Sequence, residues 1–109
     1  MNRQERHILV VDDEASARSG LERLLVSEKY KVSTADSGEA ALALVEASPP
    51  DLLITDLRMP KMDGIALLEE LRRRGNDIPV IVATAFGDIQ NAVSAMRAGA
   101  DDYLTKPIE

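Results

Sequence analysis

The feature that most constrains the fold of this chain is a strict alternation of short apolar runs with stretches of helical periodicity. The apolar runs are rich in valine and isoleucine and are mostly unbroken, which is typical of strands buried on both faces of a parallel sheet. Five strands are predicted in this way: Ile8–Val11, Tyr30–Ala35, Leu52–Thr55, Ile78–Ala83 and Tyr103–Thr105. Because strands and helices alternate, we expect an open parallel α/β sheet with right-handed crossovers and helices on both faces.

Four helices are predicted between these strands: Glu14–Glu28, Ser37–Ala47, Gly64–Arg74 and Asp88–Ala98. Apolar residues repeat at helical spacing on one face of the first helix (Ala17, Leu21, Leu24, Leu25) and of the last (Ile89, Val93, Met96). Asp36 with Glu39 resembles a capping box, and Gly99 is a helix stop signal. The sequence stops directly after the fifth strand, so we expect a fifth helix to lie beyond this segment.

Composition excludes several classes of function. The 109 residues carry a formal charge of −6, whereas a nucleic-acid-binding segment usually carries a basic surface, so no direct nucleic-acid contact is expected. There is no cysteine and His7 is the single histidine, which excludes disulfides, thiolate metal sites and histidine-rich zinc sites. No apolar run is long enough to span a bilayer, so no membrane contact and a cytoplasmic location are expected.

Polar residues of complementary chemistry stand at the ends of four predicted strands. Asp12 and Asp13 follow the first strand, Asp56 the third, Thr84 the fourth and Lys106 the fifth. In an open α/β sheet, ligands bind outside the carboxyl ends of the strands. These residues are therefore expected to converge on one edge of the sheet although they are distant in sequence.

The residue types indicate phosphoryl chemistry assisted by a metal. Three carboxylates held close together repel one another, and a divalent cation relieves that repulsion. Oxygen ligands favour Mg²⁺ over softer metals. Asp56 leaves the central strand and is the candidate nucleophile, because a carboxylate can attack phosphorus to form an acyl phosphate. Lys106 would offset charge on the phosphoryl oxygens, and Thr84 would donate a hydrogen bond to one of them.

Each of these residues has a simpler interpretation when it is taken alone. The acidic pair would cap the following helix, Asp56 would be a turn residue, Thr84 a capping hydroxyl, Lys106 an exposed lysine and Tyr103 a packed aromatic residue of a strand. It is their joint occurrence at four strand ends that favours a functional site.

The motifs that contain these residues resemble the receiver domain of bacterial two-component response regulators. They are Ile8–Glu14, Asp51–Pro60, Met62–Gly64 and Tyr103–Pro107, and the resemblance spans essentially the whole chain. It implies a flavodoxin-like open five-stranded parallel sheet in the order 2-1-3-4-5. It further implies that residues 1–109 form one receiver domain, truncated before its last helix.

The resemblance also implies a role for individual residues. Asp56 would be the phosphoacceptor. The domain would promote its own phosphorylation and autodephosphorylation, and no separate substrate that it turns over as an enzyme is expected. Asp12, Asp13, Asp56 and the backbone carbonyl of Arg58 would hold Mg²⁺, for which Mn²⁺ can substitute.

A second group of residues would contact the phosphate and transmit the change. Thr84 and Lys106 would contact the phosphate, and Thr84 with Tyr103 would form a switch pair. A cis peptide bond is expected between Lys106 and Pro107, and Ala85 fits the small residue expected after the switch threonine.

Three longer segments of the sequence are most similar to those of receivers of enhancer-binding (NtrC/DctD-like) regulators. They are Asp56–Pro60, Thr84–Asp88 and Ala95–Ala100. Such receivers are joined to an AAA+ ATPase and a helix-turn-helix domain. The implied function is transcription regulation: a sensor histidine kinase phosphorylates Asp56, and the receiver signals to its output domain. A second copy of the chain is a further expected partner, in a homodimer formed through the face of the last helix and strand.

Two other classes of protein compete with this interpretation. A haloacid-dehalogenase-like phosphatase also uses an aspartyl nucleophile and magnesium, but it carries Asp-x-Asp after the first strand, whereas Asp12 and Asp13 are adjacent. A flavodoxin-like nucleotide or flavin carrier needs a phosphate-binding loop at that position, and the acidic run ending at Glu14 has the wrong charge for one.

Overall fold

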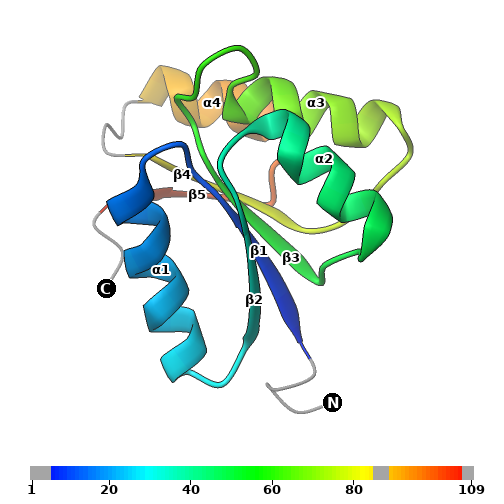
Figure 1. The fold of residues 1–109 in the computed structure, drawn as a ribbon. Helices are drawn as coiled ribbons and strands as arrows, with labels where there is room; N and C mark the ends of the chain where they lie inside the picture. Colours follow the sequence, from blue (N-terminus) through cyan, green and yellow to red (C-terminus); the bar gives the residue numbers. More distant parts are fainter. Residues whose placement is uncertain (1–5, 85–88, 107–109) are drawn as a thin grey trace.

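The computed structural model describes residues 6–84 and 89–106, which form a five-stranded parallel sheet with helices on both faces (Figure 1). The strands are β1 (His7–Val11), β2 (Lys31–Ala35), β3 (Leu52–Asp56), β4 (Val80–Thr84) and β5 (Asp102–Thr105). The helices are α1 (Ala15–Ser27), α2 (Gly38–Ala47), α3 (Gly64–Arg73) and α4 (Ile89–Arg97). The strand order is β2-β1-β3-β4-β5, which confirms the predicted flavodoxin-like topology.

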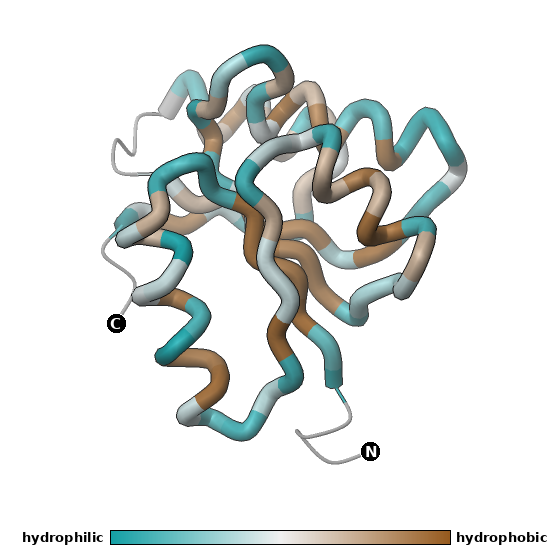
Figure 2. The backbone as a smooth tube through the Cα atoms, in the orientation of Figure 1, coloured by the Kyte–Doolittle hydropathy of each residue, from teal (hydrophilic) through white to brown (hydrophobic). Residues whose placement is uncertain are grey.

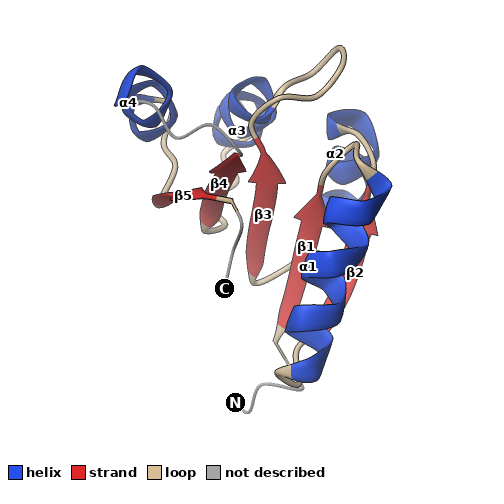
Figure 3. Cartoon of the chain, turned by 90° about the vertical axis from the view of Figure 1, so that its left-hand side faces the viewer, coloured by secondary structure: helices blue, strands red, loops and turns tan. Residues whose placement is uncertain are grey.

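The sheet separates two hydrophobic clusters, because successive side chains of a strand point to opposite faces. Leu9 and Val11 of β1 belong to the larger cluster, which α2, α3 and α4 cover. Ile8 and Val10 belong to the smaller cluster, on the side of α1. Figure 2 shows the hydrophobic strands at the centre, and Figure 3 shows α1 on the side of the sheet opposite to α2 and α3.

Several predicted element boundaries differ from the structure by one or two residues, and two of these differences have a clear local cause. The fourth strand begins at Val80, not at Ile78: the Ile78 amide donates to Asn76 Oδ1 at 3.0 Å, and Pro79 has no amide hydrogen for the sheet. Helix α2 is capped by Ser37, whose side chain accepts a hydrogen bond from the Ala40 amide at 3.1 Å, so Asp36 is not the cap. In both cases a local hydrogen bond displaces the boundary by one or two residues.

Helix α4 packs through a different face from the one its apolar spacing indicated. Val93 and Met96 are 41% and 48% exposed, whereas Ala95 is fully buried in the larger cluster and Ala98 packs against it. The small alanine side chains let the helix approach the sheet closely, so the larger apolar side chains are left outside. Ile89 was also predicted on this face, but its side chain lies outside the described part of the structure.

Other local predictions are confirmed. Gly99 has a positive φ of 107° after α4, as expected of a helix stop, and α3 begins at Gly64 as predicted, where Asp63 caps it by accepting a hydrogen bond from the Ala66 amide at 2.8 Å. Of the predicted apolar face of α1, Leu21 and Leu25 pack against the smaller cluster, whereas Leu24 is 36% exposed and lies outside it. Among the described residues, no helix combines the length and the apolar character needed to cross a lipid bilayer.

Candidate functional site

Three carboxylates predicted from strand ends meet at the carboxyl edge of the sheet. Asp12 follows β1 directly, Asp13 comes next, and Asp56 is the last residue of β3. Each offers a carboxylate oxygen within 4.8 Å of the other two. Because β1 and β3 are parallel neighbours, with Val11 opposite Thr55, the strand ends bring the two aspartates side by side.

Asp12 is the most firmly held residue of the cluster and is 5% exposed. Its amide donates to the Ala35 carbonyl at 3.1 Å, which continues the pairing of β1 with β2. Its carboxylate accepts hydrogen bonds from the Glu14 amide at Oδ1 (3.0 Å) and from Lys106 Nζ at Oδ2 (2.5 Å). The side chain therefore has one fixed orientation, whereas Asp13 beside it is exposed.

Lys106 comes directly after β5 and joins two of the carboxylates. Its Nζ lies 2.5 Å from Asp12 Oδ2 and 3.3 Å from Asp56 Oδ1. Its backbone amide donates to the Thr84 carbonyl at 2.7 Å, which extends the β4–β5 pairing by one step and carries the side chain toward β3 and β1. The sequence placed Lys106 at this edge, but its ion pairs with Asp12 and Asp56 are known only from the structure.

Burial and charge shift two pKa values in this cluster. Burial raises the pKa of Asp56 and the Asp12 charge adds to that effect, while Lys106 opposes it. Burial on its own would lower the pKa of Lys106. The hydrogen bond to Asp12 and the charges of Asp56 and Asp12 outweigh burial, so the pKa of Lys106 is raised. Lys106 thus stays charged and partly compensates the crowded carboxylates.

The three carboxylates fit a small divalent cation. An octahedral Mg²⁺ holds its oxygen ligands at about 2.1 Å, so two ligands are about 3.0 Å apart when adjacent and about 4.2 Å apart when opposite. Oxygens within 4.8 Å of one another need only a small adjustment, or one bridging water, to meet this geometry. All the available ligand atoms are hard oxygens, the type that Mg²⁺ prefers.

The loop after β3 is held against the phosphoacceptor candidate by backbone contacts. The Leu57 amide donates to the Ala83 carbonyl at 3.2 Å, and the Gly64 amide donates to the Leu57 carbonyl at 2.8 Å. A Cβ at Gly64 would lie 2.3 Å from the Asp56 carbonyl oxygen, so only glycine fits there. Arg58 is exposed in this loop, two residues after Asp56, and its role as a carbonyl ligand stays a prediction.

The predicted switch residues lie on the side of the sheet that α3 and α4 cover. Side chains alternate along β4, where Val80 and Val82 belong to the larger cluster, so Thr84 is on the side of α3 and α4. Tyr103 packs against the same cluster, and it is paired with Val82 in the register of β4 and β5. Thr84 is 2% exposed. Ala85 and Pro107 lie outside the described residues.

Sequence analysis missed three residues of this region. The Thr55 hydroxyl donates to the Asp56 carbonyl at 2.9 Å. Gly64 was interpreted only as the start of a helix, although its lack of a side chain lets α3 approach Asp56. Arg18 of α1 donates from Nη1 to the Asp12 carbonyl at 2.8 Å. No local signal marks Thr55 or Arg18, because the contacts are defined by side-chain direction and helix packing.

Comparisons with known proteins agree with this fold and site. Residues 8–109 match the response regulator receiver domain family. The chain is 44% identical over 107 residues to a protein named probable transcriptional regulator ycf27, of Porphyra purpurea; the match covers 98% of this chain and 44% of that protein. It is also 44% identical over 102 residues to the DNA-binding transcriptional regulator NtrC of Salmonella typhimurium, in a match that covers 94% of this chain and 22% of that protein. The chain thus spans less than half the length of these relatives.

Solved structures give the same answer. The crystal structure of FixJ-N superposes with a TM-score of 0.90 at 40% identity, and the match covers 100% of this chain and 86% of that one. The chain therefore belongs to the response regulator receiver domain family of two-component systems. As a family these domains are phosphoacceptor switches that work with sensor histidine kinases and output domains. The likeness to NtrC is consistent with the receiver of an enhancer-binding regulator.

Proposed function

We propose that this domain is a magnesium-dependent switch that is phosphorylated on Asp56 by a sensor histidine kinase. The observation that carries the proposal is the meeting of Asp12, Asp13 and Asp56 within 4.8 Å, with Lys106 paired to two of them. Among the described residues, no feature favours a haloacid-dehalogenase-like phosphatase or a flavodoxin-like nucleotide or flavin carrier instead. The adjacent acidic pair and the cross-sheet lysine are the arrangement expected for a receiver.

In the proposed reaction, an Asp56 carboxylate oxygen attacks the phosphorus of the kinase phosphohistidine. A P–O bond forms as the P–N bond breaks, the electron pair returns to the imidazole nitrogen, and Asp56 becomes an acyl phosphate. Asp12, Asp13, Asp56 and the Arg58 carbonyl would hold Mg²⁺, for which Mn²⁺ could substitute, and the bound ion would offset charge on the phosphoryl oxygens. Lys106 offsets the remaining charge, and water later hydrolyses the acyl phosphate in autodephosphorylation.

The signal would be carried by the residues around the fourth and fifth strands. Phosphorylation adds roughly −1.5 to −2 charge and new acceptor oxygens. Thr84 moves toward the phosphate and Tyr103 follows it, which repacks the face formed by α4 and β5. Val93 and Met96 are exposed on α4, so an apolar surface is available there for an output domain or a second copy of the receiver.

The whole protein is proposed to be a cytoplasmic transcription regulator. Its relatives ycf27 and NtrC have names of transcriptional regulators and are more than twice as long as the matched segment. By the resemblance to receivers of enhancer-binding regulators, the output part would consist of an AAA+ ATPase and a helix-turn-helix domain. The receiver itself, with a formal charge of −6, would make no direct nucleic-acid contact.

The proposal is tested by phosphorylating the chain with acetyl phosphate and Mg²⁺ and measuring acyl phosphate by intact-protein mass spectrometry. Asp56→Asn should abolish the label, as should chelation of the metal. Asp36→Asn is the matched control, because Asp36 is exposed after β2 and takes no part in the carboxylate cluster; this variant should be labelled like the wild type. Normal labelling of Asp56→Asn would remove the acceptor assignment, and labelling without metal would remove the role of Mg²⁺.

A further inference from the structure

The peptide that joins Asp12 to Asp13 is held from outside the carboxylate cluster by an arginine of α1. Arg18 Nη1 donates to the Asp12 carbonyl oxygen at 2.8 Å. The other polar atoms of Asp12 are held by Ala35, Glu14 and Lys106. The hydrogen bond from Arg18 therefore completes the set and fixes the direction in which the Asp12 carbonyl points.

This orientation matters because the Asp12 carbonyl and the Asp13 amide belong to one planar peptide group. Rotation about the Asp12 Cα–C bond turns this whole group and displaces the Cα of Asp13, and with it a side chain that is exposed and has no hydrogen bond of its own in the described part of the chain. Asp12 is anchored by three other contacts, whereas the direction of Asp13 depends on the backbone before it. A residue that fixes this peptide thus fixes where the Asp13 carboxylate lies.

Arg18 is poorly placed for helix stability, which indicates another use. It is the fourth residue of α1, near the end where the helix dipole disfavours positive charge. The helix has no acidic residue in its first turn, and its N-cap residue Glu14 makes no side-chain capping hydrogen bond. Departures of this kind from local preference are expected mainly at functional sites.

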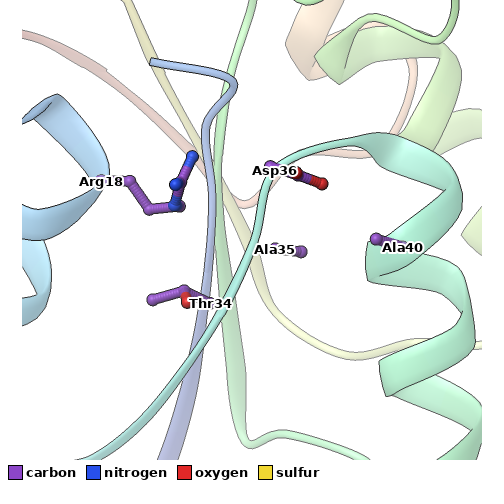
Figure 4. A pocket seen from close by; sticks show the side chains of 5 residues that line it. All are labelled: Arg18, Thr34, Ala35, Asp36 and Ala40. Atoms are coloured by element: carbon purple, nitrogen blue, oxygen red, sulfur yellow. The ribbon is translucent and has the colours of Figure 1, made fainter. Parts of the chain in front are cut away.

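The surroundings of Arg18 agree with a contact to the backbone. Arg18 lines a shallow pocket between α1 and α2 with Thr34, Ala35, Asp36 and Ala40. Figure 4 shows its guanidinium directed toward the loop after β1, and the Asp36 side chain directed away from it, toward α2. Within residues 6–84 and 89–106, the Arg18 side chain forms no ion pair, and its bond to the Asp12 carbonyl is the one hydrogen bond that its guanidinium makes.

We propose that Arg18 is a positioning residue of the cation site: it orients the Asp12–Asp13 peptide so that the Asp13 carboxylate can reach the metal. This inference rests on the proposed function, because it requires a divalent cation at the carboxylate cluster. For the affinity of the site for the cation, it predicts a change opposite to the one expected from electrostatics alone. Removing a positive charge near a cation site should strengthen binding, whereas removing a positioning contact should weaken it.

The experiment titrates the 109-residue chain with Mn²⁺, following free Mn²⁺ by electron paramagnetic resonance and displacing it with Mg²⁺. Arg18→Met should weaken binding about tenfold, at the lower end of the effect of removing a supporting contact at a metal site. Arg18→Lys keeps the charge and one donor, and should weaken binding less. Arg23→Met is the matched control on α1, since the Arg23 side chain is exposed and makes no hydrogen bond or ion pair among the described residues; it should bind like the wild type.

A second readout separates positioning from general damage. When the wild type is titrated with Mg²⁺ alone, the amide NMR signals of Asp13 and Glu14 should shift. In Arg18→Met these signals should shift less, while the signals of β2 stay unchanged. Unchanged or tighter Mn²⁺ binding by Arg18→Met would overturn the inference. If Arg18→Met does not fold, Arg18→Lys with wild-type affinity would overturn it. Failure of the wild type to bind Mn²⁺ would instead overturn the proposed function.

Discussion

Gly64 offers a direct way to disturb the phosphoacceptor backbone without touching a charged residue. In Gly64→Ala the new Cβ would lie 2.3 Å from the Asp56 carbonyl oxygen and 3.1 Å from the Asp56 carbonyl carbon. Relief of that clash needs a displacement of about 1 Å, since unbonded heavy atoms attract only near 3.5–4.0 Å. The obstructing atoms are backbone, held by the Leu57–Ala83 and Gly64–Leu57 hydrogen bonds, so no side chain can rotate away.

We expect Gly64→Ala to lower the free energy of unfolding by about 3 kcal/mol, the upper part of the usual range for overpacking. A displacement of about 1 Å at a reacting group can slow its chemistry by about 10²-fold, so phosphorylation by acetyl phosphate should fall by a similar factor. Urea unfolding and mass spectrometry measure the two effects.

Gly20 supplies the control for Gly64→Ala. It lies inside α1, and a Cβ added there would meet no atom within 4 Å, so Gly20→Ala should stabilise the domain by about 0.5–1 kcal/mol and leave phosphorylation unchanged. The steric argument would be refuted if Gly64→Ala matched Gly20→Ala in both unfolding free energy and phosphorylation rate.

Two further predictions concern stability. Lys61 has a φ of 66°, which disfavours a residue with a side chain, so Lys61→Gly should raise the free energy of unfolding by about 0.5–1 kcal/mol; a lower urea midpoint would contradict the strain. Hydrogen bonds from Arg73 and Arg74 lower the pKa of Glu70 from 4.5 to about 2. Its stabilising effect should be complete above pH 4.5 and vanish as pH falls toward 2, so melting temperatures of Glu70→Gln and wild type should converge in that interval.

Local pattern was sufficient for most of the fold, because helices and strands are selected by interactions over a few residues. The apolar runs located all five strands, and Gly99 marked the end of α4 as expected. The errors occurred where the pattern was ambiguous. The spacing of Val93 and Met96 indicates an apolar face, but it does not say whether that face or the alanine face packs on the sheet.

The candidate site was predictable in its residue types and in its edge of the sheet, since parallel strands bring their carboxyl ends together. Its contacts were not. Lys106 binds Asp12 across 94 positions of sequence, and no periodic pattern reports on a pair so far apart. The approach of Gly64 to Asp56 and of Arg18 to the Asp12 carbonyl likewise depends on how helices pack beside the strand ends.

The amino-acid sequence by itself determined the alternation of elements, the parallel sheet and the chemistry at its carboxyl edge, because these follow from hydrophobic periodicity and residue type. Only the tertiary structure decided which atoms meet there. It pairs Lys106 with Asp12 and Asp56, and it turns the alanine face of α4 inward. The physical reason is that such contacts depend on the packing of the whole sheet and its helices, which no single segment of the chain specifies.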